Sequence, residues 1–276
     1  FNILANENIN KAFVVAGDTN LHLLDSLGKK EDFEYQVFNN EYYASFAALG
    51  QSKFTHKPSL LILSSGSSVL RAIEAISNAY IDSEPLIVIS GQANSEYNFS
   101  NKIRQLGSKT VDIIKLVKSI TKYSCIVKKA NDLTYHMEKA IYLSKQGRAG
   151  PVWIDVPIDL LGITLQEKHI KHFDSSELEK NNNIKLNQTI AKILKFILKS
   201  KKPVLLVGYG IRLSNAQKQL IELVNFLKIP VMTSRRGSDL IDYRNQYYFG
   251  RPGVYGNRYS NILIQKSDLL ISIGSR

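Results

Sequence analysis

The sequence predicts an α/β protein built from two doubly wound units, each with a parallel sheet. Its 276 residues suffice for about two domains at roughly 150 residues each. Short runs of Val, Ile and Leu, bounded by Gly, Pro or Ser, alternate with longer amphipathic segments. Such runs are typical of strands buried on both faces of a parallel sheet, and their alternation with helices favours the doubly wound arrangement.

The first unit is expected to cover residues 1–160. Its strands are predicted at residues 12–16, 35–38, 60–63, 85–90 and 152–156. Its helices are predicted at residues 41–49, 68–80 and 132–145, from helical spacing of apolar residues or from a Gly after the last turn. The helix that starts at Glu41 is therefore expected to end before Gly50.

Residues 161–187 are expected to be a linker, because the stretch 166–187 is polar and has few aliphatic residues. The second unit then covers residues 188–276. We predict helices at residues 189–198 and 214–227, and strands at residues 203–207, 230–233 and 269–273. The last strand is followed almost at once by the end of the chain, so we expect this unit to be truncated and the chain to be a fragment.

Composition narrows the function classes. The chain has 36 Lys and Arg against 24 Asp and Glu, but the lysines are spread along it, which argues against a nucleic-acid interface. No apolar run approaches the roughly 18 residues that span a bilayer, so we expect no membrane partner. The single Cys125 excludes a disulfide framework. His169 and His172 lack partners at metal-ligand spacing and are interpreted as solvated linker residues.

Glu41 has two interpretations. It follows Asn39 and Asn40 at a predicted helix start, where a carboxylate in the first turn is favourable next to a capping residue. It also follows the strand 35–38, and active-site crevices of open α/β sheets lie at the carboxyl ends of strands. Position alone favours the first interpretation and leaves a catalytic carboxylate open.

Two glycine- and serine-containing turns are candidate anion sites. Gly208 and Gly210 lie between a predicted strand and a helix, but Leu213 stands where a dinucleotide fingerprint has its third glycine. On the motif alone, a tight turn that binds nothing is the favoured interpretation of the pair. The serines at residues 64–68 also open a helix and could cradle an anion, but they lack the second glycine of a nucleophile elbow, so a serine hydrolase is not expected.

The order of several segments resembles the thiamine diphosphate-dependent enzymes of the acetolactate synthase group over almost the whole chain. The matching segments are residues 38–41 (Phe-Asn-Asn-Glu), 64–66 (Ser-Ser-Gly), 78–85, 89–92 (Ile-Ser-Gly-Gln), 104–107, 120–123, 147–157, 250–253 and 267–270. The resemblance implies a thiamine diphosphate-binding fold, the pyrimidine-binding domain, at residues 1–160. A partial, Rossmann-like central domain follows. A carboxyl-terminal domain that holds the diphosphate and Mg²⁺ would lie beyond Arg276.

The resemblance also implies roles for individual residues. Glu41 would hydrogen-bond a ring nitrogen of the cofactor's aminopyrimidine, and Gln105 would face the substrate pocket. The remaining cofactor-binding residues would be Gly17, Ser65, Gly66 and Ser67 near the pyrimidine, and Gly208, Gly210, Arg235 and Arg251 for FAD in the central domain. The expected cofactors are thus thiamine diphosphate, Mg²⁺ through the missing domain, and FAD.

The implied function is decarboxylation of a 2-oxo acid and transfer of the two-carbon unit, as in acetolactate formation for branched-chain amino acids, by a cytoplasmic homodimer or homotetramer. Two alternatives stay open: transfer to a keto-sugar in surface polysaccharide synthesis, and a catalytically silent binding or regulatory homologue.

The chain departs from the family's sequence pattern at residues that would surround the cofactor. Residues 66–71 replace the usual Gly-Pro-Gly-Gly-Thr-Asn, and Asn40 and Tyr42 replace the usual His and Gln.

Overall fold

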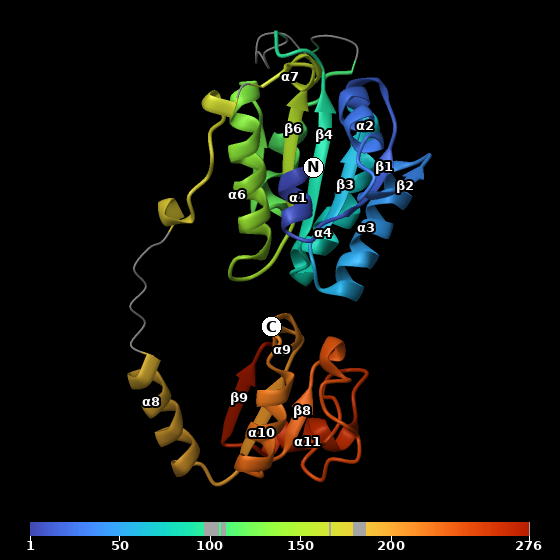
Figure 1. The fold of residues 1–276 in the computed structure, drawn as a ribbon. Coiled ribbons are helices and arrows are strands. Elements are labelled where there is room, and N and C mark those ends of the chain that lie inside the picture. The colour runs from blue at the N-terminus through green and yellow to red at the C-terminus, as the bar shows by residue number, and fades with distance from the viewer. Residues whose placement is uncertain (97–104, 106–108, 166, 179–185, 276) are drawn as a thin grey trace. The chain divides into compact units, whose positions relative to one another are not determined.

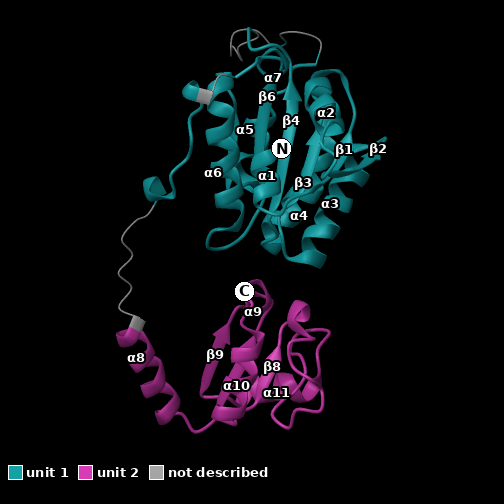
Figure 2. Ribbon diagram, in the orientation of Figure 1, with its two compact units in different colours: residues 1–180 teal, residues 181–276 magenta. Residues whose placement is uncertain are grey.

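The computed structural model describes residues 1–96, 105, 109–165, 167–178 and 186–275. The chain forms two units, Phe1–Lys180 and Asn181–Arg276 (Figure 2). Each unit is described by itself.

The first unit has a six-stranded sheet in the order β2-β1-β3-β4-β6-β5, and every pair of neighbouring strands is parallel (Figure 1). The strands are β1 Lys11–Val15, β2 Glu34–Phe38, β3 Ser59–Leu63, β4 Leu86–Gln92, β5 Tyr123–Ile126 and β6 Val152–Pro157. The helices are α1 Asn2–Asn6, α2 Leu21–Gly28, α3 Glu41–Thr55, α4 Ile73–Asp82, α5 Ile113–Val117, α6 Leu133–Lys145 and α7 Ile158–Leu161.

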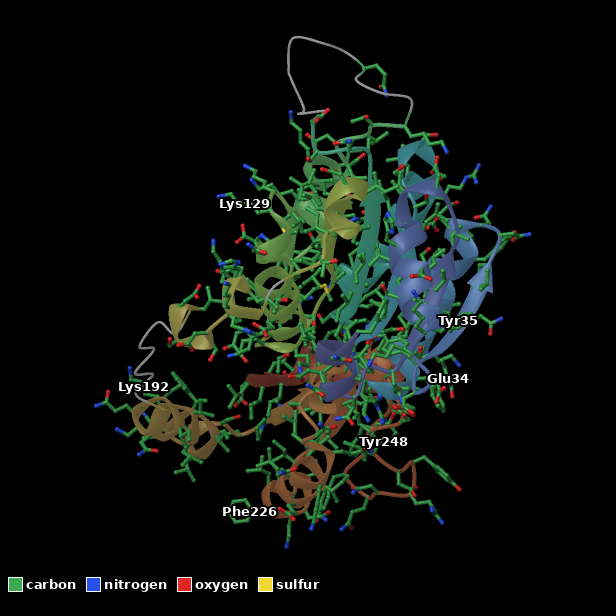
Figure 3. All side chains as sticks on the ribbon, turned by 45° about the horizontal axis from the view of Figure 1, so that its top comes forward. Glu34, Tyr35, Lys129, Lys192, Phe226 and Tyr248 are labelled. Atoms are coloured by element: carbon green, nitrogen blue, oxygen red, sulfur yellow. The ribbon has the colours of Figure 1, made fainter. Side chains whose placement is uncertain are left out.

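Helices cover both faces of this sheet, as the sequence predicts. On β3, Leu60 and Ile62 pack in a core with α1, α2 and α6, whereas Leu61 and Leu63 pack in a second core with α3, α4 and α5. All four side chains are fully buried. This alternation explains why the central strands are continuous aliphatic runs. The outer strand β2 is mostly exposed, and Figure 3 shows Glu34 and Tyr35 on it.

Two expectations about elements were wrong in detail. Helix α3 continues through the exposed Gly50 to Thr55, because its later turns still pack on the core and the Ser52 hydroxyl donates to the carbonyl of Pro85 at 2.7 Å. The helix expected at residues 68–80 begins instead as a 3₁₀ turn, Gly66–Ala72, that leads into α4. Strand β5 was not predicted, because its half-buried Tyr-Ser-Cys-Ile sequence lacks an aliphatic run.

Residues 171–173 of the expected linker contact helix α6. Nδ1 of His172 lies 2.8 Å from Oε1 of Glu138, and the backbone N–H of Phe173 donates to Oε2 of the same carboxylate at 2.8 Å. The Phe173 ring also packs edge-on against Tyr135, at 5.8 Å between centroids. This part of the polar stretch is therefore held by specific contacts, which the composition of the sequence did not reveal.

The second unit contains a three-stranded parallel sheet in the order β8-β7-β9. Its strands are β7 Pro203–Val207, β8 Val231–Thr233 and β9 Leu269–Ile273, and its helices are α8 Leu186–Lys199, α9 Gly210–Leu213, α10 Gln217–Leu227 and α11 Arg258–Lys266. Leu205 and Val207 of β7 pack against Leu220 and Val224 of α10 in its core. No helix in the described part of the chain is long and apolar enough to cross a membrane.

Gly91 of β4 marks the tightest contact between the sheet and the 3₁₀ turn Asp18–Asn20. A Cβ atom at this position would lie 2.3 Å from the carbonyl oxygen of Thr19. We expect Gly91→Ala to destabilise the protein by about 1–3 kcal/mol, the usual cost of overpacking. The measurement is the free energy of unfolding in urea.

Gly50→Ala is the matched control, since a Cβ there meets nothing within 4 Å. In an exposed helix interior, Ala is expected to stabilise by about 0.5–1 kcal/mol. If Gly91→Ala were as stable as the wild type, the turn would not pack against β4 as the structure shows.

Candidate functional site

The strand order creates a switch point between β1 and β3. From β1 the chain crosses to β2 on one side, and it then returns to β3 on the other side of β1. The loops that follow β1 and β3 therefore leave the carboxyl edge of the sheet in opposite directions. In open α/β sheets, ligands bind in the crevice that such diverging loops leave. Gly17 and the serines at residues 64 and 65 lie in these two loops.

The loops that follow β1 and β3 are in contact directly after the ends of these strands. A Cβ atom on Gly17 would lie 2.2 Å from Oγ of Ser64, so only glycine fits there. The hydroxyls of Thr19 and Ser64 are hydrogen-bonded at 3.0 Å, and the N–H of Gly17 donates to Oδ1 of Asn20 at 3.0 Å. The glycine after β1 is thus explained by close approach of the two loops.

Ser65 supplies an unsatisfied polar group next to this contact. Its hydroxyl is buried and has no hydrogen-bond partner among the described residues. Gly66 follows with φ of +84°, a left-handed conformation that favours glycine, and Ser67 is exposed. A buried hydroxyl without a partner is unfavourable, and a bound polar ligand would satisfy it.

Glu41 begins helix α3 at the carboxyl end of β2, as the sequence predicts. Oδ1 of Asn40 caps this helix by accepting from the backbone N–H of Tyr42 at 2.9 Å. The side chain of Glu41 is only 7% exposed, and Nη1 of Arg71 lies 3.6 Å from its Oε2. The carboxyl edge of the sheet thus carries a buried carboxylate and a hydroxyl without a partner among the described residues, and both can hydrogen-bond to a polar ligand.

Gln105 occupies an exposed position, and its side-chain amide donates to the carbonyl of Thr110 at 3.2 Å. Its neighbours, residues 97–104 and 106–108, lie outside the described residues. Its role in a substrate pocket stays a prediction.

A second buried carboxylate, Asp155, was not singled out from the sequence. It accepts hydrogen bonds from the hydroxyl of Ser90 at 2.5 Å and from Nε2 of Gln92 at 2.8 Å. Nε1 of Trp153 donates in turn to the Ser90 hydroxyl at 2.8 Å. Complete burial raises the pKa of Asp155 to about 7, although these hydrogen bonds oppose the shift. The family resemblance could have pointed to these residues, because they lie in two of the segments that carry it, 89–92 and 147–157.

In the second unit, the fold itself explains the two glycines after β7. A Cβ atom on Gly208 would lie 2.3 Å from the carbonyl oxygen of Gly274, and one on Gly210 would lie 2.7 Å from its Cα. The loop after β9 therefore occupies the space that the missing side chains leave. A nucleotide near these glycines stays a prediction.

The arginines assigned to a flavin diphosphate have different surroundings. Arg235 is exposed in the 3₁₀ turn Arg235–Gly237 after β8, and the guanidinium of its neighbour Arg236 stacks on the Tyr209 ring at 3.8 Å. Arg251 donates from Nη2 to the carbonyl of Tyr255 at 3.2 Å. Their part in a flavin site also stays a prediction.

Comparison with known families agrees with the fold. Residues 1–113 match the family described as "Thiamine pyrophosphate enzyme, N-terminal TPP binding domain", and residues 190–276 match "Thiamine pyrophosphate enzyme, central domain". The chain therefore belongs to the thiamine pyrophosphate enzymes and carries their N-terminal and central domains. A putative thiamin diphosphate-dependent enzyme from Mycobacterium smegmatis has a similar fold, with a TM-score of 0.82 at 22% identity, covering 100% of this chain and 51% of that one.

Among individual proteins, the chain is similar to acetolactate synthase large subunits. Those of Cyanidium caldarium and Haemophilus influenzae are each 31% identical to it, over 99% of this chain and 47% of their own length. The chain thus spans about half the length of the curated relatives it matches.

Asp155 should make stability depend on pH. An unfolded Asp titrates near 3.9, whereas the folded protein holds this proton up to about pH 7. At Asp155 the folded state binds more protons in this window, so the contribution of this group to stability should fall as pH rises through it, by at most about 1.4 kcal/mol per pH unit. In Asp155→Asn this decline should largely disappear, as urea unfolding between about pH 4 and 8 would show.

Asp25→Asn serves as the control. Asp25 is exposed and pairs with Lys29 on helix α2 at 2.6 Å, so this variant should keep the wild-type decline. An Asp155→Asn protein that still showed the full wild-type decline would contradict the assignment.

Proposed function

We propose that this chain contributes the pyrimidine-binding part of a thiamine diphosphate-dependent enzyme that decarboxylates a 2-oxo acid and transfers the two-carbon unit, as acetolactate synthases do. The observation that carries the proposal is that the carboxyl ends of β2 and β3 in one sheet are followed by the buried carboxylate of Glu41 and by the hydroxyl of Ser65, which has no partner among the described residues. The names of the relatives support the reaction class.

The residues at the switch point fit the aminopyrimidine end of the cofactor. Glu41 would share a proton in a hydrogen bond with a ring nitrogen, and its burial keeps this carboxyl group away from bulk water. The Ser65 hydroxyl would gain the partner that it lacks among the described residues. When bound, thiamine diphosphate supplies the carbon nucleophile for the 2-oxo acid, and the protein supplies orientation and one positioned carboxylate.

The other parts of the proposal lie beyond these residues. Mg²⁺ and the diphosphate would be held by a domain outside this chain, and the enzyme would work as a cytoplasmic homodimer or homotetramer. The acceptor would be a second 2-oxo acid, with a keto-sugar as the alternative. A catalytically silent homologue is the second candidate function, because residues 66–71 and the contact between Arg71 and Glu41 depart from the family pattern.

Glu41→Gln in the natural protein is expected to lower turnover by about 10² to 10⁴, because a positioned group for proton transfer is lost. The fold should be retained, since the two side chains have nearly the same shape. The measurement is hydrogen–deuterium exchange at C2 of the bound cofactor, followed by NMR.

Glu34→Gln is the control for this experiment. Glu34 lies on the exposed strand β2 and pairs with Lys11 at 3.4 Å, so its variant should exchange at the wild-type rate (Figure 3). Wild-type exchange in Glu41→Gln would show that this carboxylate does not activate the cofactor. If the wild-type protein bound the cofactor without exchange, the silent homologue would be the better proposal.

The central domain is further proposed to bind FAD. Arg235 and Arg251 are the cations that would face its diphosphate. Freshly purified natural protein should show flavin absorbance or regain it after incubation with excess FAD, and Arg235→Gln should weaken this uptake. A colourless protein that takes up no flavin would refute this part of the proposal.

A further inference from the structure

Arg71 places a cation beside the buried carboxylate of Glu41. Its Nη1 lies 3.6 Å from Oε2 of Glu41, and 59% of the arginine side chain is exposed. Hydrogen bonds between such charged groups are shorter, about 2.7–2.9 Å. The guanidinium is therefore attracted to the carboxylate without being locked to it.

The backbone of Arg71 is fixed, although its side chain is not. Arg71 lies in the turn Gly66–Ala72, which begins directly after the unsatisfied Ser65. Val69 and Ala72 in the same turn are buried in the core. Because an ion pair with such an exposed partner contributes little to stability, the guanidinium can move around its fixed anchor at little cost.

Binding of the cofactor would change the charges around Arg71. In the proposed function, Glu41 shares a proton in a hydrogen bond with a ring nitrogen of the aminopyrimidine, and this contact competes with the guanidinium. The 2-oxo acid then brings a second carboxylate into the same crevice. A guanidinium matches a carboxylate with two parallel N–H···O bonds, a geometry that an ammonium group cannot reproduce.

We propose that Arg71 recognises the carboxylate of the 2-oxo acid substrate. It lies against Glu41 in the absence of ligands and turns to the substrate when the cofactor engages Glu41. This inference rests on the proposed function, from which it takes both ligands. Arg71 forms and breaks no covalent bond; it binds the substrate and selects acids over uncharged analogues.

The test compares Arg71→Gln and Arg71→Lys with a matched control, Lys53→Gln, in the natural protein. Lys53 pairs with Asp82 at 2.8 Å near the opposite end of helix α3, away from the carboxyl edge of the sheet. Steady-state kinetics are measured with pyruvate. The affinity of uncharged methyl pyruvate is measured as a competitor. Binding of thiamine diphosphate with Mg²⁺ is measured by calorimetry in the absence of substrate.

Arg71→Gln is expected to raise KM for pyruvate on the order of tenfold to a hundredfold, with a much smaller change in kcat. The affinities for methyl pyruvate and for the cofactor should stay near wild type, Arg71→Lys should recover part of the loss, and Lys53→Gln should behave like the wild type. An unchanged KM in Arg71→Gln, or an equal loss of affinity for the ester, would overturn the inference.

Failure of the proposed function gives a different result. A wild-type protein that binds no thiamine diphosphate, or that binds it and converts no 2-oxo acid, would overturn the proposed function and this inference together. If the wild-type enzyme is active, the kinetics of the Arg71 variants test the role of Arg71 alone.

Discussion

The divergence of the chain between β1 and β3 is the constraint on which the site depends. Because the chain leaves these neighbouring strands in opposite directions, it cannot cover the sheet edge between them. The loops nevertheless meet at their base, where Gly17 lies against Ser64. The two loops thus meet through backbone and small hydroxyl side chains. Helix α3, which follows the neighbouring strand β2, brings Glu41 to the same edge.

Asp155 and Glu41 are both buried carboxylates of this unit, but their surroundings differ. Asp155 receives hydrogen bonds from Ser90 and Gln92, which offset its burial only in part, since its pKa is still raised to about 7. Glu41 lies 3.6 Å from Arg71, and it begins a helix, where the helix dipole favours negative charge. Glu41 is the better candidate for a ligand-binding group, because it lies at the carboxyl end of β2 and its charged neighbour Arg71 is largely exposed.

The sequence predicts the parts of the fold that depend on local pattern. The aliphatic runs of β3 and β4 and the start of α3 at Glu41 were found in this way, since burial on both faces and capping are visible in single segments. The end of α3 was missed because its packing on β3 outweighs the low helix propensity of Gly50. Strand β5 was missed because it is a short edge strand without an aliphatic run.

The candidate site shows the same limit. Glu41 could be placed at a strand end from the sequence, but its burial and its contact with Arg71 depend on the turn after β3, far along the chain. The unsatisfied hydroxyl of Ser65 is likewise a property of the packed loops. The family resemblance identified several of these residues, but it did not reveal their burial or their contacts.

Glycines in the two units show why a motif alone does not define a ligand site. Gly208 and Gly210 are fully explained by the backbone of Gly274, which fills the space beside them. Gly66 has a left-handed backbone, which also requires no ligand. Gly17, Gly208 and Gly210 are thus explained by the close approach of strand-end loops. In the first unit, the hydroxyl of Ser65, which has no partner among the described residues, and the buried carboxylate of Glu41 are the polar groups that a cofactor would engage.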